Sequence, residues 1–162
     1  MMKKIAGFFV AFYLGCLLIH AQNPIQTVNI ESLKKIYTVD NDTTYIINFF
    51  ATWCAPCIQE IPVLNTFYSK NNNTKNKLIL VSLDKIAALK FLQKKVDKLN
   101  IKAPVFLLNA NSDYAWLPQI DTRWQGSIPA TMVINNKKNV KAFFETPLEE
   151  GQLEFYLSKL GL

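Results

Sequence analysis

Two cysteines three positions apart are the residues of this chain best able to do chemistry. Cys54 and Cys57 stand in the stretch "NFFATWCAPCIQEIP", residues 48–62, between an apolar run and what reads as the start of a helix. A pair with this spacing has three ordinary uses: it binds a metal, it forms a local structural crosslink, or it works as a redox couple. The surrounding sequence has to decide among them.

A metal site is poorly supported by the available ligands. A structural zinc site needs four nitrogen or sulfur ligands. The chain has one further cysteine, Cys16, and one histidine, His20, and both lie in the predicted export signal described below. Haem attachment needs a histidine directly after the second cysteine, and Ile58 holds that position. We therefore expect neither a metal nor another cofactor.

A structural crosslink gains little from this spacing. A bridge between Cys54 and Cys57 closes a loop of four residues. Chain entropy then contributes about 2 kcal/mol, against about 3 kcal/mol for a fifteen-residue loop. The bridge would also join one helical turn to itself and would tie no separate elements together.

A redox couple fits the local sequence best, because the reactive form of a cysteine is the thiolate and a helix N-terminus stabilises it. Cys54 stands where the apolar run gives way to the helix, and Pro56 falls in the first turn, where its missing N–H costs no hydrogen bond. Cys57 lies one turn further in. We expect Cys54 to be the exposed nucleophile and Cys57 to be the buried resolving thiol.

The start of the chain has the layout of a secretory signal peptide. Residues 1–4 give a short basic start through Lys3 and Lys4, residues 5–19 are almost wholly apolar, and Ala21 holds a suitable cleavage position. The apolar run is shorter than the roughly 20 residues of a membrane span. We expect a signal peptide over residues 1–21 and one domain over residues 22–162, exported to the periplasm. An uncleaved membrane anchor is the alternative, and a lipid on Cys16 fits the pattern poorly.

Composition points to a folded domain and away from nucleic acid. Half of the 162 residues are hydrophobic, which is enough for a sizeable core. Removing Lys3 and Lys4 with the predicted signal leaves 16 basic residues against 12 acidic ones, so the net charge falls from +6 to +4. The lysines are scattered and have no stacking aromatic residues among them, so we expect no nucleic-acid partner.

The order of apolar runs predicts a single α/β domain. Buried strands are expected at residues 45–51 and 78–83, and a short strand or an extended segment at 104–109. Helices are expected from residue 54 through the following stretch and at 86–99, and residues 30–37 form a short amphipathic piece. A hairpin joins strands at 131–135 and 140–144. These elements predict a central mixed sheet flanked by helices.

A last helix is expected to begin in the stretch "TPLEEGQLEFYLSKL". Thr146 suits the N-cap, Pro147 suits the first helical position, and Glu149 stands three residues after the cap. Together they form the sequence pattern of a capping box.

At this point the chain resembles the thioredoxin superfamily and, within it, the exported TlpA/ResA-like thiol-disulfide oxidoreductases. "NFFATWCAPC" resembles the active-site strand and motif, with Trp53 before the first cysteine, and "GSIPATMVIN" resembles the segment that carries the family's cis-proline, here Pro129. Glu60, three residues after Cys57, matches the buried glutamate of the TlpA/ResA-like group. The resemblance runs from about residue 30 to the C-terminus and implies a thioredoxin-like fold.

The resemblance also implies roles for residues around the pair. Thioredoxin has a buried aspartate where this chain has Asn48, which cannot ionise, so Glu60 is the residue expected to exchange protons with Cys57. Trp53, Ile128 and Pro129 are expected to bind substrate, with the Ile128 backbone pairing with an extended peptide. A solvated Glu60 and an ordinary turn at Pro129 remain the alternatives.

The function implied is thiol-disulfide exchange on protein or peptide disulfides outside the cytoplasm, in the reducing direction, with electrons from a membrane donor. One rival is a peptide-binding thioredoxin-like domain whose cysteines do not turn over. Another is a peroxidase, but that chemistry needs a threonine three residues before the nucleophile, where this chain has Ala51.

Overall fold

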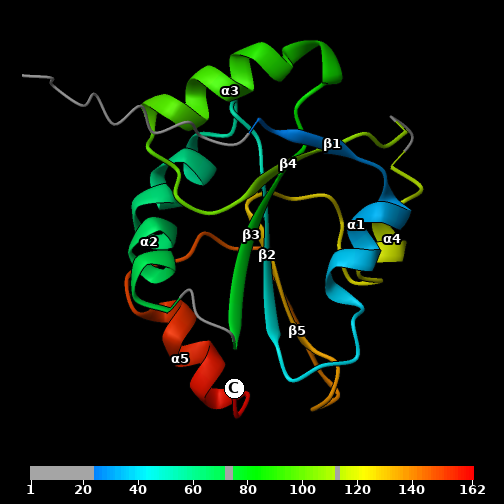
Figure 1. The fold of residues 1–162 in the computed structure, drawn as a ribbon, viewed down its shortest axis with the longest axis vertical. Helices are drawn as coiled ribbons and strands as arrows, with labels where there is room; N and C mark the ends of the chain where they lie inside the picture. Colours follow the sequence, from blue (N-terminus) through cyan, green and yellow to red (C-terminus); the bar gives the residue numbers. More distant parts are fainter. Residues whose placement is uncertain (1–23, 72–74, 112–113) are drawn as a thin grey trace, which may run out of the picture.

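The computed structural model describes residues 24–71, 75–111 and 114–162, and these residues form a six-stranded sheet with helices on both faces (Figure 1). The predicted signal peptide, residues 1–21, lies outside the described residues. Within the described ranges, no helix has the length and apolar character that crossing a bilayer requires.

The sheet is mixed, with strand order β1-β4-β3-β2-β5-β6. The strands are β1 (Gln26–Val28), β2 (Thr44–Phe50), β3 (Asn76–Ser82), β4 (Val105–Leu108), β5 (Ala130–Asn135) and β6 (Val140–Phe144). Neighbours among β1, β4, β3 and β2 pair in parallel, whereas β5 pairs antiparallel with both β2 and β6. Every residue of β2 is buried, as expected for a strand covered on both faces.

Two helical layers cover the sheet. The helices are α1 (Ile30–Tyr37), α2 (Ala55–Asn71), η1 (Ile86–Ala88, a 3₁₀ turn), α3 (Leu89–Lys98), α4 (Leu117–Ile120) and α5 (Gln152–Lys159). Apolar residues of α2, α3 and α5 pack on one face of the sheet, and those of α1 and α4 pack on the other (Figure 1). The core of the first layer contains both Cys54 and Cys57.

The predicted fold class, the strands at the sheet centre and the antiparallel hairpin are confirmed, and two short elements were not predicted. Strand β1 extends the sheet beside β4, with Thr27 opposite Leu107. Helix α4 is a single turn that brings Leu117 and Ile120 into the second core. The predicted helix at 86–99 is divided into the 3₁₀ turn and α3.

The predicted start of the last helix is wrong. Helix α5 begins at Gln152, after Gly151 with φ 75°, and the proposed capping box at Thr146, Pro147 and Glu149 does not form. The cause is tertiary: the backbone N–H of Leu148 donates to the buried side chain of Glu60, which holds this segment in an irregular path. The next hydrogen bonds are local, with the Glu149 N–H donating to Gln152 Oε1.

A candidate dithiol site at the start of a helix

Cys54 and Cys57 are joined by a disulfide at the N-terminus of α2, with their Cα atoms 5.3 Å apart. Cys54 directly precedes the helix, at the end of the turn that follows β2. Its Sγ lies 3.3 Å from the backbone nitrogen of Cys57, whose N–H is directed at it. This N–H belongs to the first turn, where backbone donors lack helical partners, so the same donor would stabilise a Cys54 thiolate after reduction.

The two cysteine residues differ in access to solvent, although less than the sequence predicted. Cys57 is fully buried, and Cys54 is 6% exposed, so Cys54 is not an exposed residue in the disulfide form. The reason is that Ile128 covers it: the Ile128 carbonyl oxygen lies 3.7 Å from Cys54 Sγ. Trp53, by contrast, is 71% exposed. Of the pair, only Cys54 keeps contact with solvent, which agrees with the predicted order of their roles and leaves that order untested.

The loop before β5 brings Ile128 to the disulfide, and its Ile128–Pro129 peptide bond is cis. The backbone N–H of Ser127 donates to the carboxylate of Glu145, 3.2 Å away, and Trp124 Nε1 donates to the Ser127 carbonyl at 2.9 Å. Both backbone groups of Ser127, the N–H and the carbonyl, are therefore held immediately before the residue that contacts Cys54.

Trp124 is a core residue and does not form part of the exposed rim. It is 4% exposed, and its ring packs against Phe49, Trp116 and Phe143 with centroid distances of 4.5, 5.4 and 5.4 Å. This aromatic cluster belongs to the hydrophobic core on the sheet face opposite α2, and it supports the loop from that side.

Glu60 is buried at 2% exposure, which excludes the alternative of a solvated helix residue. Its Oε1 accepts from Asn48 Nδ2 at 2.8 Å, and its Oε2 accepts from the Leu148 N–H at 2.8 Å. Burial raises the pKa of this carboxyl above its usual range, and the hydrogen bonds from Leu148 and Asn48 oppose that rise. Glu60 is three residues after Cys57 on α2, so the two side chains share one helix face.

Asn48 links Glu60 to the centre of the sheet. It is fully buried on β2, and its Nδ2 also donates to Thr131 Oγ1 on β5 at 3.1 Å. Its Oδ1 has no hydrogen-bond partner among the described residues. An unpaired buried acceptor costs roughly 1–3 kcal/mol, and such groups in native proteins often mark functional sites.

A second buried carboxylate, Asp84, lies at the same end of the sheet, and the sequence reading missed it. Asp84 is 5% exposed, and it accepts from both the backbone N–H and the hydroxyl of Thr52, two residues before Cys54. The sequence did contain a signal, because Asp84 comes two positions after the end of a buried parallel strand. The carboxyl ends of parallel strands lie at the same edge of a sheet, and the cysteines follow the neighbouring strand at that edge.

An open cavity of about 640 Å³ adjoins the disulfide, and Trp53 and Ile128 form part of its wall. The remaining lining residues come from the segments after β3 and β4 and from the approach to the cis-proline: Leu83, Asp84, Lys85, Ile86, Leu108, Asn109, Ala110, Asn111, Tyr114, Trp116, Leu117, Gln125 and Gly126. We call this cavity the dithiol groove.

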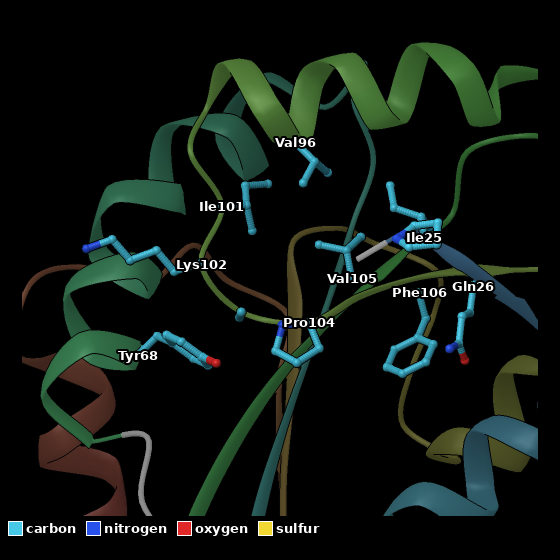
Figure 2. Close-up of a pocket in the computed structure, with 11 residues that line it drawn as sticks. Ile25, Gln26, Tyr68, Val96, Ile101, Lys102, Pro104, Val105 and Phe106 are labelled. Atoms are coloured by element: carbon cyan, nitrogen blue, oxygen red, sulfur yellow. The ribbon is translucent and has the colours of Figure 1, made fainter. Parts of the chain in front are cut away.

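A separate cavity of about 370 Å³ lies beside β1 and β4, with Tyr68, Val96, Ile101 and Phe106 around it (Figure 2). The residues that line it include none of the cysteine pair, Glu60 or the Ile128 loop. The described residues also contain no cluster of three or more histidine, cysteine or acidic side chains suited to a metal ion.

Comparison with known proteins agrees with this geometry. Residues 21–143 match the model of the AhpC/TSA family. The thiol-disulfide oxidoreductase ResA of Bacillus thuringiensis (strain Al Hakam) is 28% identical over 116 residues, covering 70% of this chain and 61% of that protein. The chain thus spans less than two thirds of the length of the ResA proteins it matches. Thioredoxin Asp f 28 of Aspergillus fumigatus is 31% identical over 84 residues, covering 46% of this chain and 70% of that protein.

Solved structures give the same fold. A thioredoxin-related protein from Neisseria meningitidis serogroup B superposes with a TM-score of 0.65 at 17% identity, covering 75% of this chain and 87% of the other. A thiol:disulfide interchange protein from Chlorobium tepidum TLS gives 0.59 at 25% identity, covering 74% and 80%. The expected thioredoxin-like fold is confirmed, and the chain belongs to the AhpC/TSA family of the thioredoxin superfamily.

Proposed function

We propose that this protein is a thiol-disulfide oxidoreductase that reduces protein or peptide disulfides through Cys54 and Cys57. The observation that carries the proposal is the disulfide at the N-terminus of α2, in which Cys54 has the only access and lies against Ile128. The ResA relatives, which are named for this activity, support it.

The exchange proceeds in two balanced steps. The Cys54 thiolate attacks one sulfur of a substrate disulfide, forms a mixed disulfide and releases the first substrate thiolate. The Cys57 thiolate then attacks Cys54 Sγ, releases the second substrate thiolate and leaves the oxidised pair. Two electrons pass to the substrate, so a reduced dithiol donor has to regenerate the protein by the reverse exchange.

Cys57 has to lose a proton before it can attack, and Glu60 is the group proposed to take it. Cys57 is fully buried, and burial in an apolar core disfavours a charged group. Burial also raises the pKa of Glu60, which brings its basicity closer to that of the thiol and makes proton exchange between them easier. Asn48 holds the carboxylate in place without competing for the proton, since an amide does not ionise in this range.

Substrate is proposed to bind between Trp53 and the loop of Ile128 and Pro129. The exposed indole of Trp53 offers an apolar surface beside the disulfide, and the Ile128 backbone, whose carbonyl lies 3.7 Å from Cys54 Sγ, is the group proposed to pair with an extended peptide. The dithiol groove continues from these residues, and Lys85 is an exposed cation on its wall. Side chains that flank the substrate cysteine would enter this groove.

We further propose that the protein works outside the cytoplasm, after cleavage near Ala21, with a membrane protein as electron donor. The support is the sequence layout of residues 1–21 and the oxidising character of that compartment, where a reductase needs an external source of electrons. Retention of the apolar segment as a membrane anchor is the rival arrangement.

The test is turnover of a protein disulfide, such as those of insulin, by residues 22–162 with dithiothreitol as donor. The account predicts multiple turnovers by the wild type and none by Cys54→Ala. The control is an Ala51→Ser variant, which changes a neighbouring buried residue and keeps both thiols. Binding of peptides without turnover by the wild type would support the non-catalytic peptide-binding domain and contradict the proposal.

A further inference from the structure

Asp84 joins two chain segments at the end of the sheet that carries the cysteine pair. Its Oδ1 accepts from the Thr52 hydroxyl at 2.7 Å, and its Oδ2 accepts from the Thr52 backbone N–H at 3.0 Å. Ser82 Oγ donates to the same Oδ2 at 2.7 Å and accepts from the Asp84 N–H at 3.1 Å. The carboxylate is therefore held from both sides by short hydrogen bonds.

These bonds continue the pairing of β2 with β3 beyond the last residues of the two strands. The last backbone bond in this series runs from the Leu83 N–H to the Phe50 carbonyl at 2.8 Å. After Phe50 the chain leaves the sheet to enter α2, and no strand partner is left for Thr52. Asp84 supplies that partner through its side chain, at the turn that leads directly into Trp53 and Cys54.

The Asp84 carboxylate accepts three hydrogen bonds, two from Thr52 in the turn and one from Ser82 on β3. Among the ion pairs of the described residues, none involves Asp84, so its buried charge is balanced by hydrogen-bond donors alone. Hydrogen bonds to an ionised acceptor are stronger than neutral ones, and two bonds to one residue fix its orientation as well as its position. Asp84 also lines the dithiol groove, so the residue that holds the cysteine turn is also part of the groove wall.

We propose that Asp84 is a positioning residue of the dithiol site: by holding Thr52, it places Cys54 at the helix N-terminus and Trp53 at the edge of the dithiol groove. The proposal rests on the proposed function. Its physical basis is that Cys54 Sγ receives the Cys57 N–H only while the turn keeps its shape. A turn released from Asp84 would move the sulfur away from the donor that stabilises its thiolate.

The experiment measures the equilibrium of the Cys54–Cys57 pair with glutathione and the alkylation rate of Cys54 in the reduced protein. Thr52→Val removes only the hydroxyl bond, and Asp84→Asn keeps the shape of the side chain while replacing one acceptor oxygen with a donor. Thr52→Ser is the conservative variant that retains the hydroxyl. Asp121→Asn is the matched control, because Asp121 is also a buried carboxylate, 4% exposed, bonded instead to Arg123.

We expect Thr52→Val and Asp84→Asn each to change the glutathione equilibrium constant by about threefold or more, which is about 14 mV at 29.6 mV per tenfold. Alkylation of Cys54 should slow in Thr52→Val and in Asp84→Asn. In Thr52→Ser and Asp121→Asn, the glutathione equilibrium constant should differ from that of the wild type by less than threefold. If Asp84→Asn does not fold, Thr52→Val decides the matter. Changes below that limit in Thr52→Val, or an equal change in Asp121→Asn, would overturn the proposal and reduce Asp84 to a stabiliser of the strand end.

Both readouts are taken on the cysteine pair itself and need no turnover. Failure of the wild type to reduce a protein disulfide would therefore count against the proposed function. Unchanged equilibrium and alkylation in Thr52→Val, in a wild type that does turn over, would count against the role of Asp84 alone.

Discussion

Replacing Glu60 with glutamine isolates its ionisation from its packing. Glutamine has nearly the same shape, and its Oε1 can still accept from the Leu148 N–H, which now lies 2.8 Å from Oε2. What is lost is the ability to take a proton, together with the hydrogen bond from Asn48 Nδ2, because the glutamine Nε2 that then faces Asn48 is itself a donor. With Cys57 fully buried, Glu60 2% exposed and Asn48 unable to ionise, bulk water has poor access to replace this base.

The expected magnitude follows from that isolation. General-base catalysis typically contributes about 10²–10⁴-fold, which is about 2.7–5.4 kcal/mol of activation free energy at 1.36 kcal/mol per tenfold. We expect resolution of the mixed disulfide by Cys57 to slow by about 10²-fold or more. Attack by Cys54 should change much less, because the N-terminus of α2 activates that thiol independently.

The assay is stopped-flow reduction of a model disulfide across pH, with quenched samples to separate attack from resolution. In the wild type, resolution should accelerate as pH rises through the pKa of Glu60, which burial places above its usual range, and Glu60→Gln should lack this step. Glu150→Gln removes an exposed glutamate from the segment that contains Leu148 and serves as the control. An identical pH profile for resolution in wild type and Glu60→Gln would refute the assignment.

Stability gives an independent readout of the same pKa. The folded-state pKa of Glu60 is raised above the ordinary value of 4.5, so its protonated form stabilises the fold. This contribution is complete below the unfolded pKa and is lost as pH rises through the folded pKa. The free energy of unfolding of the wild type should therefore fall relative to Glu60→Gln as pH increases from 4.5, the ordinary value, through the folded-state pKa.

Three further predictions concern the neighbouring residues. Cys57→Ser should accumulate mixed disulfides with substrate and Cys54→Ser should not, and faster labelling of Cys57 than of Cys54 by iodoacetamide in the reduced wild type would reverse the assigned roles. Asn48→Asp places a second carboxylate about hydrogen-bond distance from Glu60, so the two acids should titrate as a coupled pair with a raised pKa, observable by NMR, and independent titration would show that they do not share a site. Trp53→Ala should leave thermal stability unchanged, since the side chain is 71% exposed, but should raise KM for a protein disulfide by roughly tenfold, about 1.4 kcal/mol of binding; an unchanged KM would remove Trp53 from the binding surface.

The central elements could be predicted because their sequence signals are local and strong. Residues 45–51 and 78–83 are continuous apolar runs, and they became the parallel pair β2 and β3 at the sheet centre. The turn from β2 into α2 follows from the same reasoning, because a proline in the first turn and a change of period mark a helix start. Strand β1 was missed because its three residues are mostly exposed and gain their conformation from pairing with β4.

The features that the sequence alone did not predict depend on contacts between distant parts of the chain. A capping box at Thr146 was a reasonable local prediction, but the Leu148 N–H is taken by Glu60, 88 residues away, and α5 starts later. The bond between Asn48 and Glu60 joins a strand to a helix, and no spacing rule gives it; the resemblance to a known family pointed to both residues instead. Asp84 had a sequence signal, its place after a parallel strand, but its partner Thr52 is defined only by the folded turn.

The central claim is that Cys54 and Cys57 form a working dithiol/disulfide couple, and a redox titration of the folded protein against glutathione tests it most directly. Samples equilibrated at defined ratios are alkylated and the two forms are counted by mass. The account predicts reversible two-electron behaviour with the fold retained, at a potential near the thioredoxin value of about −270 mV. A pair that is reduced only when the domain unfolds would be a structural crosslink and would contradict the claim. A potential near that of DsbA, about −120 mV, would contradict the reducing direction.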